Sequence, residues 1–171
     1  LFLREPQELD PLRPDLHWLE GRIGGAPTLR SYGVEVTNGR LMNEVHREAR
    51  AAVPARHVAF LESLRTRWRT PEVFFAHAGI RPGVPLEEQD EDDLVWIRTP
   101  FLESRADHGA LVVHGHTPTD SRRIEHWDNR LDLDTAAAYG GPLSTVVLEG
   151  RSAFELTAHG RRRIEPFDFL D

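Results

Sequence analysis

The chain has 171 residues, of which 39% are hydrophobic and 29% are charged, and it contains no cysteine. This composition is typical of a folded, polar protein, and no apolar run approaches the roughly 20 residues that cross a bilayer. Without cysteine there are no disulfides or thiolate ligands, so any metal must be bound by nitrogen and oxygen atoms. The net charge of −7 disfavours a nucleic-acid-binding surface. We therefore expect a cytoplasmic protein with neither a nucleic-acid partner nor a membrane contact.

Residues 1–70 are expected to be mainly helical. A short helix over 8–20 and a loop with one helical turn over 21–34 come first. Apolar residues recur at helical spacing from 41 to 52. Pro54 can open a second helix, since proline suits the first helical turn. One apolar stripe of that helix consists of Val58, Leu61, Leu64 and Trp68.

Residues 71–171 are expected to be rich in sheet. The runs EVFFA (72–76) and ALVVHGH (110–116) are typical of buried strands that end in polar loops, and a loop or short helix is expected over 86–97. Four short strands come next, over 121–127, 130–135, 143–149 and 152–158, with turns at Asp128-Asn129 and Glu149-Gly150-Arg151. The basic run Arg161–Arg163 is expected to be a solvated patch. The chain is thus of the α+β or α/β class, with a single domain over 1–171.

Each of the two predicted buried strands is followed by a histidine, His77 in FFAHAG and His116 in VVHGHT. In sheet proteins ligands gather outside the carboxyl ends of strands, and a neutral imidazole there suits first-row divalent metals. His114 should point to the opposite side of its strand, because side chains alternate. A single histidine after a strand is more often a structural residue, so the two positions are informative only together.

Four blocks between about 72 and 149 carry a family resemblance: FFAHAGIRPG, DDLVWIR, VVHGHTPT and NRLDLDTAAAYGGPLSTVVLEG. Together and in this order they resemble the phosphoprotein phosphatase branch of the calcineurin-like metallophosphoesterases. The bacterial and phage Ser/Thr protein phosphatases and the symmetrical diadenosine tetraphosphatases are especially similar. The resemblance implies the C-terminal half of an αββα sandwich, in which two mixed sheets are flanked by helices.

The resemblance also assigns roles to individual residues. His77 and His116 match two histidines that bind the same metal of a two-metal centre. Arg98, in the VWIR block, matches an arginine that holds the substrate's phosphate oxygens, a task that suits the planar guanidinium. Tyr139 matches an aromatic residue beside the active site, which makes it a candidate substrate-binding residue. Asp134 and Thr135 match a D-T-G block and are interpreted as structural.

The family's other metal ligands lie in the motifs G-D-x-H-G, G-D-x-x-D-R-G and G-N-H-E, and none of these strings occurs in this chain. The opening residues LFLREP resemble the segment directly after the family's G-N-H-E block. We therefore expect an incomplete metallophosphoesterase domain. The complete enzyme would bind two divalent metal ions, Mn²⁺ in the first place and Fe or Zn as alternatives. This polypeptide alone should bind metal weakly and have little or no activity.

The expected function is the hydrolysis of phosphomonoesters by a metal-activated water, with a Ser/Thr phosphoprotein as substrate. Two alternatives stay open at this stage. The parent protein could be a symmetrical dinucleoside tetraphosphatase, which acts on a nucleotide, or the chain could be a non-catalytic phosphatase-like binding module. A third interpretation, a small histidine-based metal-binding barrel, would need more ligands near the H-x-H motif.

Overall fold

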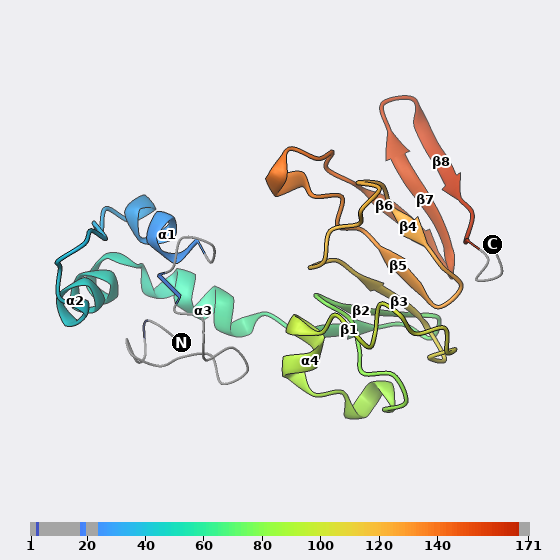
Figure 1. Cartoon of the computed structure of the whole chain (residues 1–171), viewed down its shortest axis with the longest axis horizontal. Coiled ribbons are helices and arrows are strands. Elements are labelled where there is room, and N and C mark those ends of the chain that lie inside the picture. Colours follow the sequence, from blue (N-terminus) through green and yellow to red (C-terminus); the bar gives the residue numbers. More distant parts are fainter. Residues whose placement is uncertain (1–2, 4–17, 20–23, 168–171) are drawn as a thin grey trace. The chain divides into compact units, whose positions relative to one another are not determined.

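The computed structural model describes residues 3, 18–19 and 24–167. The chain forms two compact units, Leu1–Leu64 and Arg65–Asp171. Its class is mixed α/β, with helices first and strand-rich sheets after them (Figure 1), as the sequence predicts. No helix among the described residues is long and apolar enough to cross a membrane. The expected single domain over 1–171 stays a prediction.

The first unit contains α1 (Gly25–Ser31), α2 (Met42–Ala52) and α3 (Ala55–Ser63). The predicted helix over 41–52 is confirmed, because its apolar positions Val45 and Ala49 are buried against the end of α1. The predicted helix over 8–20 lies outside the described residues, apart from Trp18 and Leu19. The small core of this unit consists of Leu29, Val34, Val45 and Ala49, with partly buried neighbours around them.

Helix α3 begins directly after Pro54, as predicted, but its apolar stripe was predicted wrongly. None of the helix residues is buried, and Leu61 and Leu64 are 63% and 54% exposed. The helix ends at Ser63 because Leu64 already has an extended backbone, with φ −67° and ψ 144°. Trp68 therefore lies in a strand of the second unit and cannot continue the stripe.

The second unit contains a five-stranded sheet in the order β1-β2-β3-β5-β4. Its strands are β1 (Arg67–Arg69), β2 (Val73–Ala76), β3 (Leu111–His114), β4 (Glu125–His126) and β5 (Arg130–Asp132). The three central strands are parallel to one another, and both edge strands are antiparallel to their neighbours. Both predicted buried strands are confirmed. The strand predicted over 121–127 shortens to two residues, and β1 was not predicted.

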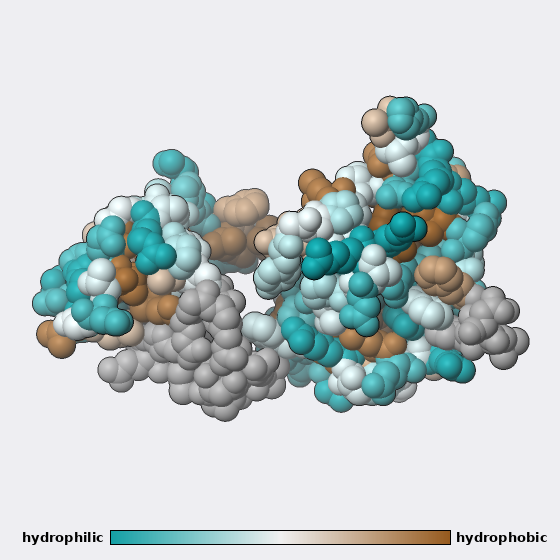
Figure 2. Space-filling model, turned by 45° about the horizontal axis from the view of Figure 1, so that its top comes forward, coloured by the Kyte–Doolittle hydropathy of each residue, from teal (hydrophilic) through white to brown (hydrophobic). Residues whose placement is uncertain are grey.

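Side chains alternate along β2 and β3, so each strand contributes to two apolar layers. On one face, Phe74 and Val112 pack against α4 (Glu91–Trp96), the 3-10 helix η1 (Leu86–Glu88) and the loops around them. On the other face, Val73 and Leu111 pack against a second sheet. The five-stranded sheet is therefore covered on both faces. Figure 2 shows a mostly polar surface on this unit, interrupted by smaller apolar patches.

The second sheet is antiparallel and contains β6 (Val146–Glu149), β7 (Ser152–Thr157) and β8 (Gly160–Ile164). The predicted tight turn between β6 and β7 is confirmed, with Gly150 at a φ of 60° that favours glycine. The arginines of the run 161–163 are exposed, as predicted, but they lie in a strand. Their ion-pair partners are Glu149, Glu155 and Glu165, respectively.

Gly79, in the loop after β2, offers a test of this packing. It has a φ of 147°, and a Cβ atom there would lie 2.2 Å from Cδ1 of the buried Phe101. We expect Gly79→Ala to lower the free energy of unfolding by about 2–4 kcal/mol, because a buried ring must move. Gly83→Ala is the matched control, since Gly83 has a φ of 81° but open space around it, and it should cost about 1 kcal/mol. Urea denaturation followed by tryptophan fluorescence measures both, and equal losses would contradict the close contact.

Candidate functional site

The candidate site lies where the parallel strands β2, β3 and β5 end. One hydrogen bond continues the β2–β3 pairing beyond the strands, from the backbone N–H of Gly115 to the carbonyl of His77, at 2.9 Å. On the other side of β3, the N–H of Leu133 donates to the carbonyl of His114, also at 2.9 Å. The residues directly after the three strands therefore leave the sheet side by side, and Asp134 is among them.

The structure brings the two predicted metal ligands together. Nδ1 of His116 lies 3.2 Å from Nε2 of His77, and the rings meet edge to face with centroids 4.9 Å apart. Without a metal, one ring can donate a hydrogen bond to the other. In a shared metal site, each imidazole nitrogen would lie about 2.1 Å from the ion, with a nitrogen–metal–nitrogen angle of about 90–109°. The two nitrogens would then be roughly 3.0–3.4 Å apart. The observed separation fits a shared divalent ion equally well.

His116 is held in an unusual state. Its φ is 69°, in the left-handed region that non-glycine residues rarely adopt, and such strain tends to collect at functional positions. Burial lowers the pKa of His116, and the positive charges of His77 and Arg98 lower it further, while Asp134 acts in the opposite direction. These effects keep the imidazole neutral near pH 7, which is the form that binds metals.

Helix α4 provides one wall of the site. The ring of Trp96 stands perpendicular to that of His116, with centroids 5.7 Å apart. Arg98 comes two residues later and is exposed, and its charge acts on His116. The helix is tied to the end of β2, because the N–H of Ala78 donates to the carbonyl of Leu94 at 2.7 Å. Arg98 is therefore placed near the histidine pair.

The loop between His77 and α4 is fixed by two side chains. The amide of the buried Gln89 accepts a hydrogen bond from the N–H of Arg81 at 2.6 Å and donates to the carbonyls of Arg81 and Val84. Arg81 forms a two-pronged ion pair with Asp93 of α4, with both contacts at 2.6 Å. This loop is therefore pre-organised, and His77 has little freedom to leave its position.

Tyr139 has no hydrogen bond or ring contact with the histidine pair among the described residues. It lies in the 3-10 helix η2 (Ala137–Tyr139) and is 76% exposed, without a side-chain contact to either histidine in the described part of the chain. Thr135 is buried and donates to the carbonyl of Pro142 at 2.6 Å, as expected of a structural residue. Asp134 accepts from the N–H of Ala136 at 3.0 Å, so part of its carboxylate also holds this turn.

Three residues around the pair were not among the predicted site residues: Trp96, Thr117 and Asp134. Trp96 and Asp134 both act on His116. Oγ1 of Thr117 is buried and has no hydrogen-bond partner among the described residues, which is unusual and consistent with a nearby bound water or ion. Asp134 could have been found, since it comes shortly after the third parallel strand. Within residues 3, 18–19 and 24–167, no group of three or more metal-binding side chains occurs.

Behind the site, His114 and Asp132 form a buried pair. Nε2 of His114 lies 3.9 Å from Oδ2 of Asp132, and the histidine ring packs edge to face on Phe101. Burial lowers the pKa of His114 to about 4 and raises the pKa of Asp132 to about 7. The shifts show that the pair is not an ion pair near pH 6, where both side chains are mainly neutral. His114 is thus packed inside, as its strand position predicts.

No protein-family model matches this chain, and no curated protein sequence matches it.

Asp132 predicts a pH dependence of stability. Its folded pKa of about 7 lies above the ordinary value near 3.8, so the folded state binds the proton more tightly. Protonated Asp132 therefore stabilises the folded state at low pH. This contribution to the free energy of unfolding is lost as the pH rises from about 4 to 7. Asp132→Asn should remove that loss. The stability of the variant relative to the unmodified protein should then increase from pH 5 to pH 8, by at most about 3 kcal/mol.

Urea denaturation at pH 5, 6, 7 and 8 measures this difference. The pKa of His114 is lowered, so its stabilising effect rises with pH up to its ordinary value of 6.5, but it is present in both proteins. Asp128→Asn, at an exposed position, is the matched control. A difference between Asp132→Asn and the unmodified protein that does not change with pH would contradict the raised pKa.

Proposed function

We propose that this chain carries part of the metal centre of a metallophosphoesterase of the phosphoprotein phosphatase branch. The proposed reaction is the hydrolysis of a phosphomonoester, with a phosphorylated serine or threonine of a protein as the substrate. The observation that carries the proposal is the pair of facing nitrogens of His77 and His116, 3.2 Å apart at the ends of two adjacent parallel strands. The resemblance of the sequence blocks around both histidines adds to it.

The residues fit the group that the proposal implies. Two imidazole nitrogens and no thiol suit a first-row divalent ion such as Mn²⁺, with Fe or Zn as alternatives. When bound, two such ions supply Lewis-acid activation of water and neutralise charge on the phosphate. His77 and His116 would hold one ion, and the remaining ligands would have to come from outside the described residues. His116 contributes a neutral ring in a fixed orientation, which needs no proton to be removed first.

Arg98 is proposed to bind the phosphate group. It is exposed, it comes two residues after Trp96, which ends α4 and borders His116, and its charge acts on that histidine. A guanidinium donates two parallel hydrogen bonds to phosphate oxygens and stays charged at any physiological pH. Tyr139 stays a candidate substrate-binding residue, and its exposed ring would have to meet the substrate from the surface.

The proposed fold is the C-terminal half of an αββα sandwich. Two observations support it: the two sheets share one apolar layer, and α4 packs on the outer face of the five-stranded sheet. The second candidate function is a non-catalytic phosphatase-like binding module. It is favoured by the contact between His77 and His116, which can be a hydrogen bond between one nitrogen of each ring without any metal. A symmetrical dinucleoside tetraphosphatase would use the same histidines and differs in its substrate.

Metal binding by the 171-residue chain tests the centre directly. We expect weak Mn²⁺ binding by isothermal titration calorimetry, and His116→Ala or His77→Ala should weaken it at least about tenfold, because one of two ligands is lost. His159→Ala is the matched control, since His159 is exposed in the turn between β7 and β8. Binding that neither site variant changes would contradict the proposed centre.

Catalysis is tested in the protein extended upstream along its own reading frame, with manganese and an aryl phosphate. Arg98→Lys keeps the charge but loses the planar fork, and we expect kcat/KM to fall by about 10- to 100-fold. Arg161→Lys, on the exposed strand β8, should leave it unchanged. No turnover above that of a His116→Ala variant would favour the binding module, and a phosphoserine peptide compared with diadenosine tetraphosphate separates the two substrate classes.

A further inference from the structure

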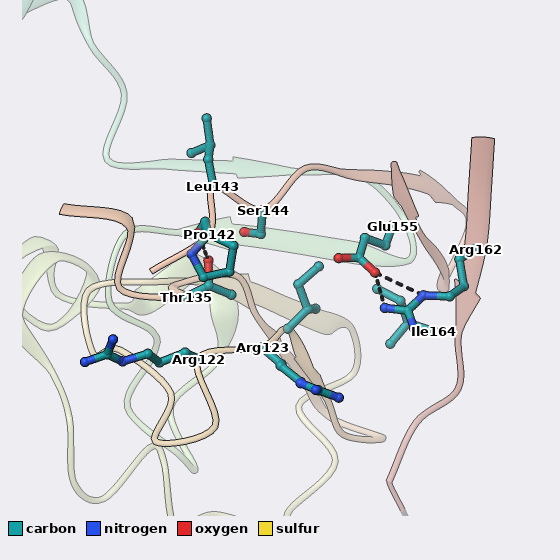
Figure 3. A pocket seen from close by; sticks show the side chains of 10 residues that line it. Arg122, Arg123, Thr135, Pro142, Leu143, Ser144, Glu155, Arg162 and Ile164 are labelled. Carbon is teal, nitrogen blue, oxygen red and sulfur yellow. Dashed lines mark hydrogen bonds and ion pairs between the residues drawn. The ribbon is translucent and has the colours of Figure 1, made fainter. Parts of the chain in front are cut away.

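A pocket of about 230 Å³ lies between the loop after His116 and strands β7 and β8 of the second sheet. Arg122 and Arg123 line it from the loop, and Glu155 and Arg162 line it from β7 and β8. Figure 3 shows Arg162 turned toward Glu155, and Arg122 and Arg123 extending away from each other. Apolar side chains such as Leu143, which is 85% exposed, complete the lining.

The charge of this pocket is positive in a chain of net charge −7. Glu155 is already engaged by Arg162, whose Nε lies 3.1 Å from Oε2 of the glutamate. The side chains of Arg122 and Arg123 have no ion-pair partner in the part of the chain that the structure describes. The pocket is thus lined by three arginines and one glutamate, and only Arg162 is turned toward the carboxylate (Figure 3). Arg122 and Arg123 are left to bind an anion.

The loop that carries the two free arginines is held in place. Oγ1 of Thr119 donates to the carbonyl of Arg123 at 2.8 Å, and the N–H of Arg122 donates to the carbonyl of Thr119 at 3.1 Å. Arg122 has a φ of 52°, a left-handed conformation that costs free energy in a non-glycine residue. A strained backbone that is fixed by surrounding hydrogen bonds is typical of functional loops.

The pocket is connected to the histidine pair through the backbone. The N–H of Thr119 donates to the carbonyl of Asp134 at 2.9 Å, and Asp134 acts on His116. Thr135, the residue after Asp134, lines the pocket. One wall of the pocket, formed by the loop after His116 and by Thr135, therefore begins at the candidate site, and β7 and β8 form the other wall.

We propose that this pocket binds an anionic side chain of a peptide, a carboxylate or a second phosphate, next to the residue that occupies the histidine site. The pocket thereby selects acidic peptides, and in this role it rests on the proposed function. A peptide fits better than a nucleic acid, because the positive region is confined to a few arginines in an acidic chain and lies beside the exposed Leu143. Guanidinium groups recognise carboxylate and phosphate alike.

The test measures binding, so that it does not depend on turnover. Fluorescence anisotropy is recorded for a labelled decapeptide with three glutamates next to a leucine, for the same peptide with glutamines, and for one with phosphoserine in place of a glutamate. The glutamate and phosphoserine peptides should bind at least about tenfold more tightly than the glutamine peptide, and inorganic phosphate and salt should displace them. The tighter of the two anionic peptides identifies the preferred group.

The double variant Arg122→Ala/Arg123→Ala should weaken binding of the anionic peptides at least about tenfold, since two charge-assisted contacts are lost. Arg56→Ala/Arg161→Ala removes the same net charge from exposed positions elsewhere and should have little effect. Arg122→Lys/Arg123→Lys keeps the charge and should lie between the two, which also covers the case that the alanine variant folds poorly.

Equal binding of the glutamate and glutamine peptides, or equal losses in the two alanine double variants, would overturn the proposal. So would binding of a single-stranded RNA as tightly as the acidic peptides. Failure of the proposed function is distinguishable, because binding is measured without metal and is repeated in His116→Ala. If the extended protein has no phosphatase activity but peptide binding still depends on Arg122 and Arg123, the proposed enzymatic function is wrong and the proposed peptide-binding pocket is supported.

Discussion

The site depends on one hydrogen bond, from the backbone N–H of Gly115 to the carbonyl of His77. It continues the parallel pairing of β2 and β3 past the ends of both strands, so the next residues cannot separate. The close approach of the two imidazole rings is a consequence of this register. The backbone of His116 has to turn sharply into the left-handed region to bring its ring back over His77. Sheet pairing thus stabilises the strained backbone of His116. The imidazole ring of His116 is then already oriented to bind a ligand.

Short apolar runs allowed much of the second unit to be predicted. VFFA and LVVH are buried on both faces, and such strands are recognisable without alternation. Strands with weak or misleading patterns were lost: β1 carries two arginines around an exposed tryptophan, and β8 is a run of arginines. Three of these arginines pair with glutamates of other segments, Arg69 with Glu87, Arg161 with Glu149 and Arg162 with Glu155, and these pairings are not evident from the local sequence. The prediction of an apolar stripe on α3 was wrong because the helix ends at Ser63 and the backbone of Leu64 is extended.

Only the part of the candidate site that directly follows the buried strands could be predicted from the sequence. His77 and His116 come after buried strands, so their proximity could be anticipated from parallel pairing alone. The approach of Trp96 depends on the loop between His77 and α4, which is fixed by Gln89 and by the pair of Arg81 with Asp93. No sequence pattern specifies such a loop conformation. Asp134 was interpreted as structural, and its place at the site becomes evident only once β5 is known to be the third parallel strand.

The charge near this edge of the sheet is positive, whereas the net charge of the whole chain is negative. The protein has a net charge of −7, so at long range it repels an anionic substrate. At physiological ionic strength, charges more than about 8 Å apart are largely screened, and the nearest groups dominate. Those groups are the neutral ring of His116, the exposed Arg98 and the free arginines of the loop after β3. Burial of His114 and Asp132 in their neutral forms adds no opposing charge beneath them at slightly acidic pH. An anion therefore meets a local attraction that the average charge of the chain conceals, and this attraction should weaken above pH 7 as Asp132 ionises.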